Sequence, residues 1–194
     1  VLNKKIFFWS PHLSHVGTIN AVLNAAKVFN KFSNYDVYII DNFGEFSKIN
    51  TGEYNINFLK IFNLSNFLPK TGLLSKFFIY FFSLLSLPQF IFLMRKYKPD
   101  CLIINLVGFA PLMVKNFFCK NCFVINSIQG YPRFNFTRKI IWKIFYNRSD
   151  LIVTMTDLSK QKLIKEAGIL EGKIIKINNP VINRSIRILA KEKI

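Results

Sequence analysis

Residues 4–29, KKIFFWSPHLSHVGTINAVLNAAKVF, decide the fold of this 194-residue chain. The apolar run at 6–9 is typical of a buried strand, and it ends at Ser10-Pro11 because proline cannot donate a hydrogen bond to a neighbouring strand. After a polar loop, Gly17-Thr18 opens a segment whose apolar residues recur at helical spacing through position 29. The stretch therefore predicts a strand, a loop, a glycine and a helix whose N-terminus faces the end of the strand.

The same alternation of short apolar runs and helical patterns continues along the chain. Further strands are predicted at 35–40, 56–61, 101–105, 123–127, 150–154 and 173–177. The strand at 56–61 is expected near an edge of the sheet. Helices are predicted at 108–118, 136–147 and 157–167. Strands that alternate with helices favour a parallel sheet with helices on both faces, so we expect an α/β, Rossmann-like fold.

The last of these helices has recognisable ends. Asp157 is expected to cap its N-terminus, and Gly168 is expected to end it.

The longest apolar stretch, 73–97, has no charged residue from Phe77 to Met94. Its length is enough to suggest a membrane span, but the strands before and after it must lie in one sheet, which a single crossing would separate. We expect a buried crossover helix with a kink near Pro88. The alternative is an apolar helix that dips into a membrane surface. The cations beside it are Lys70, Lys76, Arg95, Lys96 and Lys98.

The composition limits the classes of function. The chain has a formal net charge of +17, which suits nucleic acid, anionic lipid or phosphate-bearing substrates. The lysines are scattered and no nucleic-acid-binding motif occurs, so we expect no nucleic-acid partner. A dinucleotide-binding protein is disfavoured because the glycine fingerprint is absent, although Asp41 follows the second strand.

The three cysteines do not form a disulfide framework. Cys119 and Cys122 make one C-x-x-C pair without a second pair of ligands, so we expect no metal site. Cys101 is expected to be buried in a strand. Free thiols and an N-terminus without a signal peptide predict a cytoplasmic location.

Ligands on a parallel sheet bind at the carboxyl ends of the strands. The loops expected there are 10–18, 41–46, 105–110, 127–134 and 154–157. Their candidate polar residues are His12, His15, Thr18, Asn105, Gln129, Arg133 and Thr156. No catalytic triad, pair of carboxylates or P-loop occurs among them.

Four places in the sequence together resemble the N-terminal, acceptor-side domain of GT-B glycosyltransferases of the glycogen-synthase-like group, family 4. Val16-Gly17-Thr18 is similar to the family's glycine loop, which is usually Gly-Gly. Lys98-Pro99-Asp100 is similar to its Lys-Pro-Asp, and Ser127-Ile128-Gln129-Gly130 lies where the family often has His-Gly or His-Asp. Residues 148–154 and 173–181 resemble its closing strands and interdomain linker.

The resemblance implies that residues 1–180 form the N-terminal half of a GT-B fold. Residues 181–194 would begin the connection to a donor domain that the chain lacks, so the chain alone is expected to be inactive. The implied activity is transfer of a sugar from a nucleotide-sugar, a substrate rather than a cofactor, with retention of configuration and without a metal. The competing function is a non-enzymatic basic module that binds a membrane surface or nucleic acid.

The glycine loop is expected to bind the donor phosphate. The backbone N–H groups of Gly17 and Thr18 lie at a helix N-terminus, where negative charge is stabilised. A side chain at Gly17 would crowd the phosphate and conflict with a positive φ. A turn at the start of a helix is the alternative reading of this glycine, and Val16 departs from the family pattern.

The resemblance assigns the catalytic position to Gln129, which would hydrogen-bond a sugar hydroxyl. Because Gln129 replaces the family's histidine, no imidazole is available there. The alternative is a solvated loop residue, and the histidines at the first loop are either acceptor contacts or loop caps. The remaining substrate-binding candidates are His12, His15, Asn105, Gly130 and Arg133.

The implied acceptor is a glycan or a lipid-linked molecule in cell-surface polysaccharide synthesis. An acceptor carried on lipid would be met at an anionic membrane surface, and residues 64–78 combine apolar side chains with Lys70 and Lys76. The chain is therefore expected to associate peripherally with the inner face of the cell membrane. The alternative is that these apolar side chains pack on the sheet.

Overall fold

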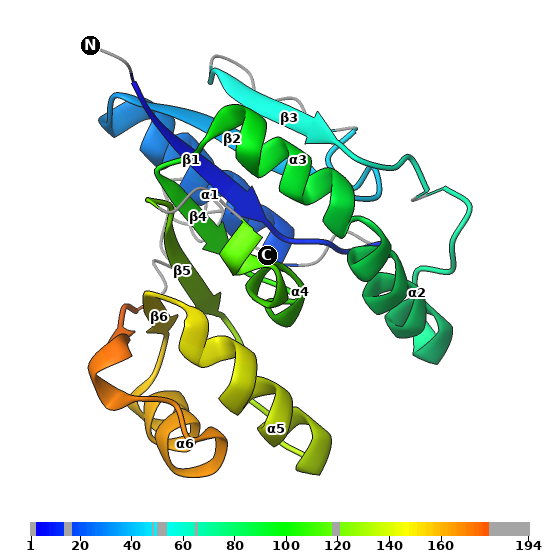
Figure 1. The fold of residues 1–194 in the computed structure, drawn as a ribbon. Coiled ribbons are helices and arrows are strands. Elements are labelled where there is room, and N and C mark those ends of the chain that lie inside the picture. Colours follow the sequence, from blue (N-terminus) through cyan, green and yellow to red (C-terminus); the bar gives the residue numbers. More distant parts are fainter. Residues whose placement is uncertain are drawn as a thin grey trace, which may run out of the picture.

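The computed structural model describes residues 3–13, 17–47, 49, 54–64, 66–117 and 121–178 (Figure 1). Within these residues, seven parallel strands form one sheet in the order β3-β2-β1-β4-β5-β6-β7. The strands are β1 Lys4–Trp9, β2 Tyr35–Asp41, β3 Ile56–Lys60, β4 Cys101–Ile104, β5 Phe123–Ile128, β6 Leu151–Thr154 and β7 Ile174–Lys176. This order confirms the Rossmann-like α/β fold, and β3 lies at an edge of the sheet as expected.

Helices follow every strand of the sheet except β2 and β7 in the order of elements. The α-helices are α1 Gly17–Phe32, α2 Gly72–Leu85, α3 Leu87–Tyr97, α4 Phe109–Met113, α5 Phe136–Phe145 and α6 Asp157–Ala167. Short 3-10 helices are η1 Lys115–Phe117, η2 Tyr146–Arg148 and η3 Glu171–Lys173.

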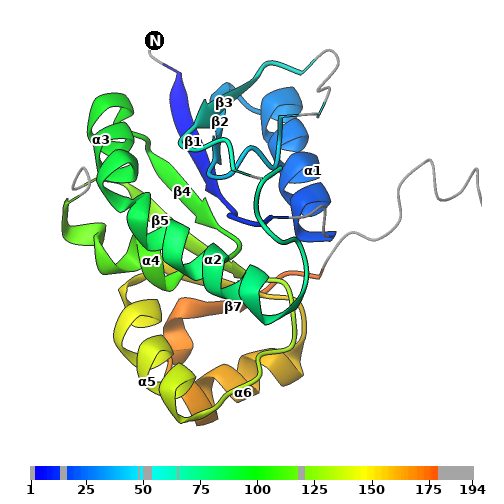
Figure 2. The same cartoon turned by 90° about the vertical axis from the view of Figure 1, so that its right-hand side faces the viewer.

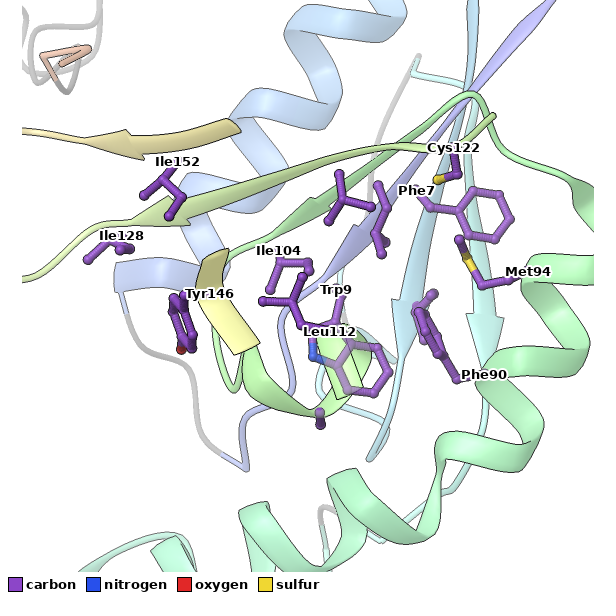
Figure 3. Close-up of a cluster of buried hydrophobic side chains, with 14 of the residues drawn as sticks. Phe7, Trp9, Phe90, Met94, Ile104, Leu112, Cys122, Ile128, Tyr146 and Ile152 are labelled. Carbon is purple, nitrogen blue, oxygen red and sulfur yellow. The ribbon is translucent and has the colours of Figure 1, made fainter. Parts of the chain in front are cut away.

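Side chains alternate between the two faces of β1 and build two cores. Phe8 packs on the α1 side, in a cluster with buried residues of β2. Phe7 and Trp9 lie on the opposite side, in the larger cluster with residues of α3 and α4 (Figure 3). Leu163 and Ala167 of α6 belong to the same cluster. There Trp9 is fully buried and meets Phe90 of α3 edge-on, with the ring centroids 4.8 Å apart. Helices therefore cover both faces, with α1 on the other side of the sheet from α3 (Figure 2).

Two aspartates immediately before strands tie neighbouring strands together. Asp100 Oδ2 accepts a hydrogen bond from the backbone N–H of Lys5 at 2.7 Å, and Asp150 Oδ2 accepts one from Val124 at 2.7 Å. Lys98, in the left-handed region at φ 47°, ends α3 just before Asp100. The Lys98-Pro99-Asp100 motif therefore stops a helix and sets the register of β4 against β1.

Three local predictions are wrong in detail. The helix expected at 108–118 is shorter, because α4 ends at Met113 and η1 follows. Thr156, not Asp157, caps α6: its side chain accepts a hydrogen bond from the N–H of Ser159 at 3.1 Å, while Gly168 ends the helix at φ 62° as expected. Cys101 lies in β4 but is only partly buried, which still raises its pKa to about 11 and keeps it a thiol at neutral pH. Cys119 lies outside the described residues.

The apolar stretch at 73–97 forms two helices, α2 and α3, that bend by 48° at Ser86, which confirms a kink next to Pro88. The expectation of a buried helix is wrong for α2, because Leu73 is 82% exposed and Phe77 is 59% exposed. Figure 1 shows α3 along the sheet and α2 extending past it. None of the described helices alone could cross a membrane. Together, α2 and α3 have the length and apolar composition of a membrane span, but they are bent relative to each other.

Candidate functional site

A cavity of about 800 Å³ lies beyond the carboxyl ends of β4 and β5. The loops after these two strands, the start of α1, one residue of α2 and the first turns of α5 line it. Thr18 reaches it from the connection after β1, and Asn105 from the connection after β4. β1 and β4 are neighbours where the strand order changes direction, which is where ligands bind on open parallel sheets.

Three of the amide side chains in the polar lining of the cavity lie at the ends of β4 and β5. Gln129 Nε2 donates a hydrogen bond to Asn105 Oδ1 at 3.1 Å. Asn105 Nδ2 and Asn126 Nδ2 are buried, and neither has a hydrogen-bond partner within the described part of the chain. A buried donor without a partner costs free energy, on the order of 1–3 kcal/mol, so both atoms are suited to an oxygen of a bound molecule.

The loop between β4 and α4 is tightly packed under this lining. A Cβ atom built on Gly108 would lie 2.8 Å from Asn126 Nδ2 and 3.1 Å from the hydroxyl of Tyr146. Val107, just before it, has φ 48°, a strained conformation for a β-branched residue. Burial raises the pKa of Tyr146, so its hydroxyl stays protonated at neutral pH.

Aromatic rings, among them Trp142 and Tyr146, contribute to the lining of the cavity. Trp142 stacks on Tyr146 with the centroids 4.1 Å apart, and Phe134 meets Trp142 edge-on at 5.1 Å. Tyr80 of α2 contacts Phe109 of α4 at 5.9 Å. Apolar and aromatic walls with a few placed polar groups are typical of sites for small molecules.

The entrance to α5 adds positive charge. Arg133 and Arg138 both line the cavity, and Arg138 Nη1 donates to the carbonyl of Arg133 at 3.1 Å. Asn135 caps α5 by accepting a hydrogen bond from the N–H of Arg138 at 2.9 Å. Two guanidinium groups beside a helix N-terminus favour a negatively charged ligand.

The structure brings together five of the residues that the sequence proposed for the site. They are Thr18, Asn105, Gln129, Gly130 and Arg133. Their roles in binding or catalysis stay predictions.

The first loop departs from expectation. Gly17 begins α1, it has no positive φ, and a Cβ there would meet nothing within 4 Å, so the expected backbone constraint is wrong. His12 follows β1, is half-buried and does not line the cavity. His15 and Val16 lie outside the described residues.

Sequence reasoning missed Asn126, Gly108, Trp142 and Tyr146. Asn126 carried a signal, because it is a polar residue inside the mostly apolar strand β5. Trp142 and Tyr146 are spaced four residues apart, like core residues of a helix, and only the topology places them over the cavity. No cluster of three histidine, cysteine, aspartate or glutamate side chains suited to a metal ion occurs within the described ranges.

The arrangement of the strands is that of the Rossmann-like fold found in GT-B glycosyltransferases. A glycosyltransferase from Rickettsia africae superimposes with a TM-score of 0.69 at 14% identity, over 98% of this chain and 46% of that one. A sucrose-phosphate synthase structure from Thermosynechococcus elongatus gives 0.62 at 13% identity, over 96% of this chain and 95% of that one.

The same fold also occurs in a UDP-N-acetylglucosamine 2-epimerase from Rickettsia bellii, with a TM-score of 0.61 at 14% identity. The match covers 99% of this chain and 50% of the epimerase. The chain thus spans about half the length of this epimerase and of the Rickettsia africae protein. The sequence matches no protein-family model and none of the curated proteins. These likenesses show the fold, and the fold does not select the glycogen-synthase-like group.

Proposed function

We propose that the chain is the acceptor-side domain of a retaining glycosyltransferase of the glycogen-synthase-like group. It would transfer a sugar from a nucleotide-sugar to a glycan or lipid-linked acceptor in cell-surface polysaccharide synthesis, on the cytoplasmic side. The observation that carries the proposal is the cavity at the strand ends, where the donors Asn105 Nδ2 and Asn126 Nδ2 lack partners among the described residues. Such donors suit the hydroxyl oxygens of a sugar.

The cavity suits the acceptor, and its rim suits the charge that develops during transfer. Gln129 Nε2 is held by Asn105, which leaves Gln129 Oε1 as an acceptor for a sugar hydroxyl. Arg133 and Arg138 place positive charge where a departing diphosphate is stabilised electrostatically. The N-terminus of α1, at Gly17 and Thr18, adds backbone N–H groups at the same end of the sheet.

A second candidate is a nucleotide-sugar epimerase, favoured by the likeness to the Rickettsia bellii structure over 99% of this chain. The two functions differ in one requirement. A transferase releases nucleotide only when an acceptor is present, whereas an epimerase changes the sugar without one. Chromatography of donor and products, with and without acceptor, separates them when the chain is assayed with a nucleotide-sugar-binding half.

Tryptophan fluorescence tests binding to the cavity directly. The chain has two tryptophans; Trp9 is fully buried in the core, and Trp142 lines the cavity. Titration of residues 1–194 with oligosaccharides, UDP-glucose and UDP-N-acetylglucosamine is therefore expected to give a saturable signal from Trp142. The Trp142→Phe variant should lose that signal.

The polar lining is tested with Gln129→Ala. Loss of one hydrogen bond, worth about 0.5–1.5 kcal/mol, should weaken binding by about 2- to 12-fold. Gln161→Ala, the same change on an exposed position of α6, is the matched control and should bind as the wild type does. The proposal is wrong if no sugar or nucleotide-sugar changes the fluorescence. It is also wrong if Gln129→Ala binds as well as the Gln161→Ala control does.

A further inference from the structure

Helix α2 turns a continuous apolar face outward. The α2 face consists of Leu73, Leu74, Phe77, Phe81, Leu84 and Leu85, all of them exposed. The i, i+4 spacing from Leu73 to Phe77, Phe81 and Leu85 keeps them on one side of the helix. Phe77 and Phe81 stack on each other with the centroids 5.9 Å apart. The buried side of the helix is narrow, since it consists of Ser75, Ile79 and Ser83.

The stretch of sequence that contains α2 carries only positive charge. From Tyr54 to Pro99 the sequence has no acidic residue. The basic residues in this range are Lys60, Lys70, Lys76, Arg95, Lys96 and Lys98. Lys70 and Lys76 are exposed and flank the start of α2, where Thr71 makes no side-chain cap and the first turn has no carboxylate. The positive end of the helix and two cations therefore meet beside the α2 face.

We propose that the α2 face docks on an anionic lipid bilayer, with Lys70 and Lys76 at the lipid phosphates. The occupant must be apolar over the helix and negatively charged at its N-terminal end, and an anionic bilayer offers both properties at one surface. The 14 residues of α2 extend about 21 Å at 1.5 Å per residue, short of the hydrocarbon thickness of about 30 Å. The helix therefore lies in the plane of the interface.

The docked helix would bring the candidate site to the membrane. Tyr80 belongs to α2, is 42% exposed, and lines the cavity beside Phe109. The acceptor would then be a lipid-linked molecule that enters the cavity from the bilayer. This step rests on the proposed function, whereas the docking of α2 does not.

Flotation with lipid vesicles tests the docking without any sugar substrate, so its result is independent of the proposed function. Residues 1–194 are mixed with vesicles of phosphatidylcholine alone, or with about 30% phosphatidylglycerol. Binding is expected only to the anionic vesicles. It should fall at least tenfold between about 0.05 M and about 0.5 M salt, because screening weakens contacts with the head groups.

Two variants separate the parts of the surface. Lys70→Glu with Lys76→Glu should weaken vesicle binding at least tenfold, and Phe77→Ser with Phe81→Ser should do the same. The matched control is Lys31→Glu with Lys165→Glu, which changes the net charge equally on α1 and α6 and should bind as the wild type does. Circular dichroism checks that each variant is folded, which is expected because these side chains are exposed.

Three results would overturn the docking proposal. The first is a wild-type chain that does not float with anionic vesicles. The second is an equal loss of binding in the control, which would assign binding to overall charge. The third is a concentration-dependent dimer in sedimentation that Phe77→Ser with Phe81→Ser abolishes while vesicle binding persists, which would make a second copy the occupant of the α2 face.

Discussion

A side chain at Gly108 should destabilise the protein, although the backbone conformation of this glycine is one that any residue adopts. It has φ −62° and ψ −26°, so alanine there should reduce the freedom of the unfolded chain and stabilise the protein by about 0.4–1 kcal/mol. The contacts oppose this gain. The new Cβ would lie 2.8 Å from Asn126 Nδ2, 3.1 Å from the Tyr146 hydroxyl and 3.3 Å from Asn126 Oδ1.

These neighbours cannot move cheaply. Asn126 is 2% exposed and fixed on β5, and Tyr146 is buried and stacked on Trp142. Overpacking of such a site typically costs about 1–3 kcal/mol. The net effect of Gly108→Ala is therefore a loss of about 1–2 kcal/mol, which lowers the melting temperature by about 2–8 °C for a domain of this size.

The matched control is Gly130→Ala, which lies in the same cavity but whose Cβ would meet nothing within 4 Å. Thermal and urea unfolding of both variants and the wild type measures the difference. Gly130→Ala should unfold within about 0.5 kcal/mol of the wild type. If Gly108→Ala is as stable as the wild type or more stable, the close packing of the loop on Asn126 and Tyr146 is refuted.

Two further predictions concern stability. Burial, and then the neighbouring Asp41, raise the pKa of Glu45 well above its ordinary value. Protonated Glu45 therefore stabilises the folded state. This contribution to the free energy of unfolding is present in full below about 4.3, the pKa of Glu45 in the unfolded chain, and it is lost as the pH rises through the pKa of Glu45 in the folded protein. Glu45→Gln should flatten this fall in urea titrations from acid to neutral pH; an unchanged slope contradicts it. Asn135→Ala should remove the cap of α5 and cost about 1 kcal/mol in urea unfolding, which an unaltered midpoint would exclude.

The order of elements could be predicted from the sequence because most strands are apolar runs that end near a residue unsuited to a strand. Pro11 follows β1, and Lys98-Pro99-Asp100 separates α3 from β4. The loops that hold Asn105 and Gln129 follow from the strand ends alone. The hydrogen bond between Gln129 and Asn105 was not predictable. This 3.1 Å contact joins two loops that come together only because β4 pairs with β5.

The remaining site residues depend on tertiary placement. The spacing of Trp142 and Tyr146 places both residues on one face of a helix. That spacing is the same whether the face lines a cavity or packs in a core. Thr156 replaced Asp157 as the cap of α6 because the local backbone, extended at Thr156, decides which side chain reaches the N–H of Ser159. Both residue types are good caps, so composition could not choose between them.

The prediction that α2 is buried was wrong for a reason that bears on the role of this helix. Apolar composition predicts burial only if the fold offers apolar surface to cover, and beneath α2 there is little. The small cluster there consists of Leu13, Phe43 and Ile79, with partly buried neighbours at its border. Ser75 and Ser83 face this side, and Ser86 Oγ bonds the carbonyl of Ser83 at 2.8 Å.

A rotation of α2 that buried its leucine and phenylalanine face would need space that Phe43 and Leu13, both almost fully buried, already fill. Each large apolar side chain gains about 1.5–3 kcal/mol when it leaves water. The fold leaves six of them between 40% and 82% exposed on one helix, so part of that gain is not realised. Docking on an external apolar surface would release the remainder, and the lysines at the N-terminal end of α2 would favour an anionic one.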